Sequence, residues 1–128
     1  MKKKILFVTS TRADYGKLKS LIINIQKNNN FISKIFVSGM HNLKLYGSTY
    51  DELVQDKIRG IVRYINQTKN LRMDQILMNT IGGFSNFLTK YKPDLVIIHG
   101  DRIEPLACAL TSLLNNFLVA HIEGGEVS

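Results

Sequence analysis

The 128-residue sequence lacks several features that define specialised classes of protein. Its single cysteine, Cys108, excludes an internal disulfide framework and a cysteine-rich zinc site. Two prolines and nine glycines exclude collagen-like and low-complexity chains. No segment reaches the roughly 18 apolar residues of a membrane span, and the apolar run at residues 5–8 is shorter than the roughly 7–15 residues of a signal-peptide h-region. We therefore expect a cytoplasmic protein that does not enter a membrane.

Three common nucleotide and catalytic motifs are also missing. The sequence has no G-x-G-x-x-G dinucleotide fingerprint, no G-x-x-x-x-G-K-[ST] phosphate loop and no G-x-S-x-G nucleophile elbow. A standard dinucleotide site, a P-loop and a serine hydrolase site are therefore excluded.

Positive charge is concentrated in the first half of the chain. Residues 1–60 carry 11 Lys/Arg and 4 Asp/Glu, a net charge of +7, whereas residues 61–128 carry 6 of each. A basic half is compatible with nucleic acid, a membrane surface or an anionic small molecule. No recognised nucleic-acid motif accompanies the charge, so we expect no nucleic-acid partner.

Apolar runs at residues 5–8, 95–98 and 117–120, and a shorter one at 35–37, have the composition of buried strands. The runs are continuous rather than alternating, as in parallel sheets covered on both faces. Between them, apolar residues recur at helical spacing over residues 18–25 and 76–88, and a leucine-rich stripe runs over 106–114. In the middle, Ser48 could cap a short helix through Asp56, and residues 61–65 have the pattern of a strand.

This alternation of strands and helices indicates an α/β fold, Rossmann-like, with a mostly parallel sheet and helices on both faces. The sequence stops directly after a strand and its loop, where such a sheet usually continues. We therefore expect residues 1–128 to be an amino-terminal domain that is truncated.

The candidate chemistry lies in three loops that follow predicted strands, because ligands of open α/β sheets bind beyond the carboxyl ends of the strands. Arg12 and Lys17 flank the start of the first helix, where free N–H groups and two cations would suit a diphosphate; alternatively, both are solvated surface charges. Asp101 and Glu123 each follow a buried strand and could form an acid–base pair. Alternatively, Asp101 caps the helix that starts near Ile103.

Two histidines lie in the same loops. His99 precedes Asp101 by two residues and His121 precedes Glu123 by two, so each pair could bind a metal. The plainer interpretation is that both histidines line the sheet edge and hydrogen-bond to backbone. Cys108 falls within the third helical stripe, and we expect a packed thiol there.

Four segments together carry a family resemblance: residues 11–18 (TRADYGKL), 37–41 (VSGMH), 93–104 (PDLVIIHGDRIE) and 119–126 (VAHIEGGE). They resemble the hydrolysing UDP-N-acetylglucosamine 2-epimerases of bacterial sialic-acid synthesis, in order and over nearly the whole chain. The resemblance implies the first domain of a two-domain, glycosyltransferase-B-like architecture. The run 124–127 (GGEV) replaces an Ala-Gly-Leu-Arg-like run of the non-hydrolysing relatives, which favours the hydrolysing branch.

The resemblance also implies a reaction and its residues. UDP leaves UDP-N-acetylglucosamine by elimination, water adds to the glucal, and N-acetylmannosamine and UDP result. Asp101 and Glu123 match the catalytic carboxylates, with base and acid unassigned. The residues that match UDP contacts are Arg12, Gly16, Lys17 and Arg102. The resemblance implies no cofactor and no metal. It does imply a homodimer.

Other readings stay open. A sister epimerase that acts on a diacetamido-trideoxy UDP-sugar is similar enough to remain possible. The same architecture also serves glycosyltransferases, and a non-catalytic nucleotide-sugar-binding domain would need no acid–base pair.

Overall fold

The structure, a computed structural model, describes residues 2–10, 12–38, 49–64, 71–100 and 102–122. Its centre is one five-stranded sheet in the order β3-β2-β1-β4-β5. All strand pairs are parallel. The strands are β1 (Lys3–Thr9), β2 (Phe31–Val37), β3 (Ile61–Arg63), β4 (Leu95–His99) and β5 (Val119–Ile122).

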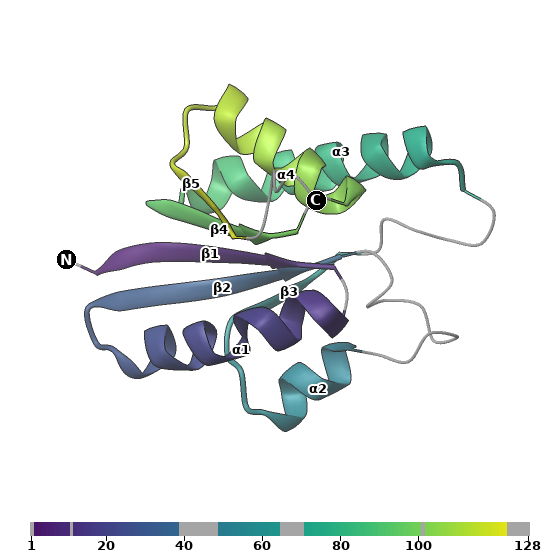
Figure 1. The fold of residues 1–128 in the computed structure, drawn as a ribbon. Coiled ribbons are helices and arrows are strands. Elements are labelled where there is room, and N and C mark those ends of the chain that lie inside the picture. The colour runs from purple at the N-terminus through teal and green to yellow at the C-terminus, as the bar shows by residue number, and fades with distance from the viewer. Residues whose placement is uncertain (1, 11, 39–48, 65–70, 101, 123–128) are drawn as a thin grey trace.

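Helices cover both faces of this sheet (Figure 1). α1 (Arg12–Lys27) and α2 (Thr49–Gln55) lie on one face, and α3 (Met73–Tyr91) and α4 (Ile103–Leu114) lie on the other. The expected α/β, Rossmann-like architecture is therefore confirmed. No described helix is both long enough and apolar enough to cross a membrane.

The continuous apolar run of β1 is explained by the two covered faces. Ile5 and Phe7 pack into the core beneath α1 and α2, whereas Leu6 and Val8 pack into the core beneath α3 and α4. Because successive side chains of a strand point to opposite faces, a strand between two helix layers needs apolar residues at every position.

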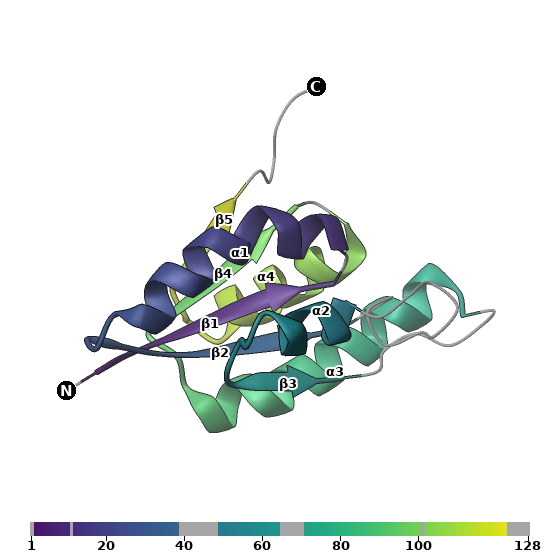
Figure 2. The ribbon, with the colours of Figure 1, turned by 90° about the horizontal axis from the view of Figure 1, so that it is seen from below.

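The strand order reverses beside β1, and open α/β sheets bind their ligands in a crevice at such a point. The chain runs outward from β1 to β2 and β3, and α3 then carries it back to β4 on the other side of β1. Figure 2 shows α1 and α2 from below, in front of the sheet. The chain leaves β1 and β4 toward opposite faces of the sheet, but both strands end at the same carboxyl edge.

The expected start of the last strand needs correction. The final strand begins at Val119 and not at residue 117, because the chain still turns there: Asn116 has a φ of 63° and the Phe117 amide donates to the Ser112 carbonyl at 2.9 Å. The leucine stripe does lie on a helix, α4, but its leucines at 106, 110, 113 and 114 are 45–74% exposed. α4 turns its smaller residues inward instead, and Cys108 among them is fully buried, as predicted.

The middle of the chain follows the prediction where the structure describes it. The short helix α2 ends at Gln55, one residue before the expected end, and β3 comprises Ile61–Arg63. Ser48 and residue 65 lie outside the described residues.

Candidate functional site

The start of α1 follows directly on the end of β1 and is organised by one carboxylate. Arg12 is the first residue of α1, and its side chain lies outside what the structure describes. Asp14, in the first turn, accepts hydrogen bonds at Oδ2 from the Ser10 amide at 3.2 Å and from the Ser10 hydroxyl at 2.8 Å. A carboxylate at this position also complements the positive end of the helix dipole.

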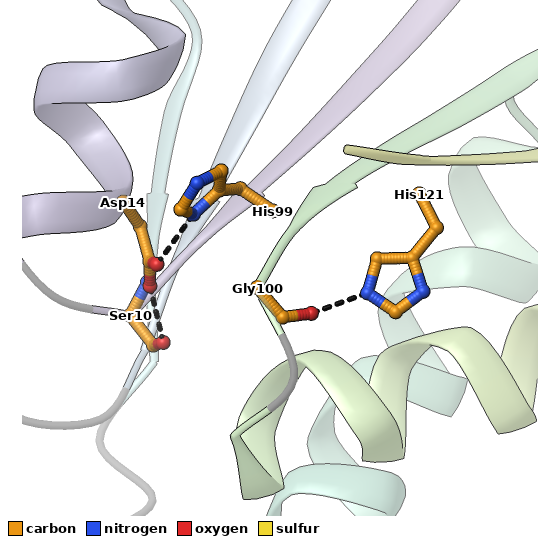
Figure 3. A network of polar contacts seen from close by, with 5 residues as sticks. All are labelled: Ser10, Asp14, His99, Gly100 and His121. Atoms are coloured by element: carbon orange, nitrogen blue, oxygen red, sulfur yellow. Dashed lines mark hydrogen bonds and ion pairs between the residues drawn. The ribbon is translucent and has the colours of Figure 1, made fainter. Parts of the chain in front are cut away.

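The same carboxylate contacts the end of β4. Asp14 Oδ1 lies 2.9 Å from Nδ1 of His99, and the two side chains are 6% and 9% exposed (Figure 3). Asp14 thus uses both carboxyl oxygens, with Oδ2 accepting from Ser10 and Oδ1 facing the imidazole of His99. A side chain in the first turn of α1 is thus joined to a side chain at the end of β4, 85 positions away.

Gly100 joins the β4 loop to β5. Its amide donates to the Ile122 carbonyl at 3.0 Å, and its carbonyl accepts a hydrogen bond from Nε2 of His121 (Figure 3). Gly100 has a φ of +87°, a conformation that side chains strongly disfavour. A Cβ at this position would lie 3.4 Å from Asp14 Oδ1, so the chain turns close against the carboxylate.

The expected backbone contact is confirmed for His121. His121 hydrogen-bonds to backbone, as predicted, whereas His99 bonds to the Asp14 carboxylate. Among the described residues, no three His, Cys, Asp or Glu side chains are grouped so that they could hold a metal ion.

Arg102 lies at the N-cap position of α4. The helix starts at Ile103, as predicted, and the exposed Arg102 has an extended backbone and makes no side-chain cap hydrogen bond. The N-cap position thus belongs to Arg102, and Asp101, the cap expected as an alternative, lies outside the described residues.

Gly16 and Lys17 lie on the exposed side of α1, one turn after its start. A Cβ added at Gly16 would meet no atom of the described structure within 4 Å. Packing within the described part of the chain therefore does not require a glycine here.

The two expected catalytic acids, Asp101 and Glu123, both lie outside the described residues. Their chain neighbours Gly100 and Ile122 are described, and these are the two residues joined by the 3.0 Å hydrogen bond. In the parallel register of β4 and β5, His99 also pairs with Ile122. The two segments that lead to the acids therefore end side by side.

Ser10, Asp14 and His99 were not assigned together from the sequence. A signal was available, because β1 and β4 are neighbours across the point where the strand order reverses. Polar residues that follow these two strands must converge at one edge of the sheet.

Cys108 takes no part in this site. It is fully buried in the core between α4 and the sheet. Burial, and the nearby Glu104 carboxylate, raise the pKa of its thiol well above the usual value. A thiol of this kind is protonated and unreactive.

A cavity of about 230 Å³ lies at the opposite, amino edge of the sheet, with Lys2, Gln26 and Arg59 among its lining residues. Gln26 and Arg59 hydrogen-bond to each other there: the Gln26 amide nitrogen donates to the Arg59 carbonyl at 2.8 Å, and the Arg59 guanidinium donates to the Gln26 carbonyl at 2.8 Å. These groups connect α1 to the segment before β3. We therefore place the candidate site at the carboxyl edge, where the loops of β1, β4 and β5 meet.

Comparison with known proteins identifies the family of this chain. Residues 23–128 match the family model described as UDP-N-acetylglucosamine 2-epimerase. The chain is 43% identical, over 98% of its length, to a UDP-N-acetylglucosamine 2-epimerase of Neisseria meningitidis serogroup B, of which it covers 33%. It is 34% identical, over its whole length, to a hydrolysing UDP-N,N'-diacetylbacillosamine 2-epimerase of Legionella pneumophila, of which it covers 35%.

A solved structure shows the same fold. The UDP-N-acetylglucosamine 2-epimerase of Neisseria meningitidis, in complex with UDP-N-acetylglucosamine, superposes with a TM-score of 0.82 at 29% identity, over 95% of this chain and 32% of that one. The chain thus spans about a third of the length of these relatives. On this evidence the chain belongs to the UDP-N-acetylglucosamine 2-epimerase family.

Proposed function

We propose that this chain is the amino-terminal domain of a two-domain hydrolysing UDP-N-acetylglucosamine 2-epimerase. The whole enzyme converts UDP-N-acetylglucosamine and water into N-acetylmannosamine and UDP, for sialic-acid synthesis. The observation that carries the proposal is the junction at Gly100 and Ile122, which brings the segments before Asp101 and Glu123 together in a chain of this family.

The reaction needs positive charge at the diphosphate. In the proposed elimination, the bond between C1 and the UDP oxygen breaks, and both electrons leave with UDP. Arg12, Lys17 and Arg102 come from the loops and helix starts at the crevice, where cations stabilise the charge that develops on the leaving group. The start of α1 adds backbone N–H groups and a partial positive charge.

The reaction also needs a base and an acid. One carboxylate of the Asp101–Glu123 pair removes the proton from C2, which yields the glucal. Water then adds its hydroxyl to C1, and a proton is delivered to C2 from the face that gives the manno configuration. General acid–base catalysis of this kind contributes roughly 10²–10⁴ in rate.

A second substrate has specific support. The Legionella relative is named for UDP-N,N'-diacetylbacillosamine, a diacetamido-trideoxy sugar, and a Campylobacter jejuni relative with 31% identity is named for the GDP- and UDP-linked forms. The proposed chemistry at C1 and C2 would be the same with either sugar. The difference would lie at the far side of the ring.

The test is the identity of the product formed by the full-length enzyme. We expect NMR to show free N-acetylmannosamine and UDP from UDP-N-acetylglucosamine, at a higher kcat/KM than from the diacetamido sugar. A product that is still linked to UDP would contradict the hydrolysing branch, and the reverse substrate preference would favour the second candidate.

A further inference from the structure

The contact between Asp14 and His99 joins two buried polar side chains. The cores on both faces of the sheet are made mainly of apolar side chains, yet here a carboxylate and an imidazole, only 6% and 9% exposed, lie 2.9 Å apart between α1 and the end of β4. Burying a polar or charged pair costs desolvation that apolar packing would not. Such a pair instead fixes the relative position of the two elements that it joins, because a hydrogen bond restrains both distance and angle.

The pair connects the two loops that carry the proposed site. Asp14 lies two residues after Arg12 on α1, and its other oxygen holds Ser10 at the end of β1. On the other side, His99 is followed by Gly100, which is bonded to Ile122. One carboxylate thus links the start of α1 with the ends of β4 and β5.

We propose that Asp14 and His99 are positioning residues, whose hydrogen bond aligns the diphosphate-binding start of α1 with the segments that carry the reacting acids. This inference rests on the proposed function for its consequence in catalysis. The 2.9 Å contact between Asp14 Oδ1 and Nδ1 of His99 holds the imidazole ring in place. Neither residue needs to touch the substrate for this role.

The expected kinetic effect follows from the geometry. Misplacing reacting groups by about 1 Å can lower the rate about 10²-fold, whereas attraction between charges falls only gradually with distance. In the full-length enzyme, we therefore expect Asp14→Asn and His99→Gln each to lower kcat about 10- to 100-fold. The Kd of UDP should change by less than about threefold.

Two substitutions at His99 separate positioning from direct chemistry. The amide nitrogen of asparagine can take the place of Nδ1, whereas that of glutamine takes the place of Nε2. Positioning predicts that His99→Asn recovers most of the kcat that His99→Gln loses, and that the Asp14→Asn/His99→Gln double variant is no slower than the worse single variant. Equal loss in both His99 variants, or multiplied losses in the double variant, would overturn the proposal.

Asp56→Asn is the matched control. Asp56 also ties α1 to another element, since it accepts a 2.6 Å hydrogen bond from the Tyr15 hydroxyl and pairs with Lys19 at 3.1 Å, but it lies away from the proposed site. We expect a lower melting temperature with an unchanged kcat. If Asp56→Asn lowers kcat as much as Asp14→Asn does, the effect is general loss of stability and the proposal fails.

Amide hydrogen exchange tests the link without any activity. In the 128-residue chain, we expect Asp14→Asn to speed exchange at Gly100 at least about tenfold relative to Phe7 in the centre of β1, and His99→Gln to do the same at Ser10, with opening of these local contacts as the cause. Exchange that changes only on the mutated side would overturn the link. Absence of epimerase activity in the unmutated full-length protein would instead reject the proposed function, and the exchange result would still decide the inference.

Discussion

Gly100 and Gly16 should respond in opposite ways to the same substitution. At Gly100, alanine would have to adopt a φ of +87°, and left-handed backbone costs an L-residue about 1–2 kcal/mol. The new Cβ would lie 3.4 Å from Asp14 Oδ1, an ordinary van der Waals distance, so the backbone strain dominates. Gly16 lies in the interior of α1 with no atom within 4 Å of an added Cβ, and alanine in such a helix position is more stable than glycine by about 0.5–1 kcal/mol.

These free energies convert into melting temperatures. Unfolding entropy is about 2.1 cal/mol/K per residue, which gives about 0.27 kcal/mol/K for 128 residues. Gly100→Ala should therefore lower the melting temperature by about 4–7 °C and Gly16→Ala should raise it by about 2–4 °C. Circular dichroism of both variants beside the unmutated chain measures the two shifts.

Gly16→Ala also separates folding from binding. If the nucleotide lies against α1, the added methyl group obstructs it, so the more stable variant should bind UDP more weakly, as calorimetry would show. A Gly100→Ala variant that melts at or above the unmutated chain would refute the strain argument. Unchanged UDP affinity in Gly16→Ala would refute the placement of the nucleotide.

Three further predictions concern single groups. Arg12→Ala and Arg102→Ala should each weaken UDP binding about ten- to a hundredfold, since a charge-assisted hydrogen bond contributes about 1.5–3 kcal/mol. Calorimetry measures the affinity, and an unchanged affinity in both variants would contradict the placement of the nucleotide at these loops. Asp101→Asn and Glu123→Gln should lower turnover per folded molecule at least about 10²-fold without a change in melting temperature, and a lower melting temperature with normal turnover would assign a structural role instead. Burial raises the pKa of the Cys108 thiol above its usual value of 9.0, so at high pH the folded chain retains a proton that the unfolded chain releases. The free energy of unfolding should therefore fall as the pH rises above about 9. Urea titrations from pH 8 to 10 should show a smaller fall for Cys108→Ala.

The architecture was predictable because the burial pattern is local in the sequence. A strand with a continuous apolar run, such as residues 5–8 of β1 or residues 95–98 of β4, requires helices on both faces, and the apolar residues of β1 indeed alternate between the two cores. The carboxyl-edge location of the site follows from the same order of elements.

The orientation of α4 was not predictable in the same way. Its leucines have helical spacing, but α4 has two faces that could be buried. The spacing alone does not show which of the two faces packs against the sheet. Here Cys108 and other small residues face inward, and Leu113 is 61% exposed. The shift in β5 has a local cause, since Asn116 adopts a left-handed backbone and delays the strand.

The contact between Asp14 and His99 spans 85 positions, and no local pattern encodes it. The sequence places both residues at the same edge of the sheet, but the direction of a side chain depends on the packed structure. The contact of His99 with Asp14 was therefore not predicted, whereas the predicted bond from His121 to backbone was confirmed.

The fate of the hydrogen on C2 tests the central proposal most directly. The full-length enzyme is incubated with UDP-N-acetylglucosamine in deuterated water, and the sugar product is analysed by NMR and mass spectrometry. Elimination followed by hydration predicts free N-acetylmannosamine that carries one deuterium at C2, because the original proton passes to an enzyme carboxylate and is replaced from solvent. Product that retains the original hydrogen at C2, or that remains attached to UDP, would contradict the hydrolysing epimerase mechanism.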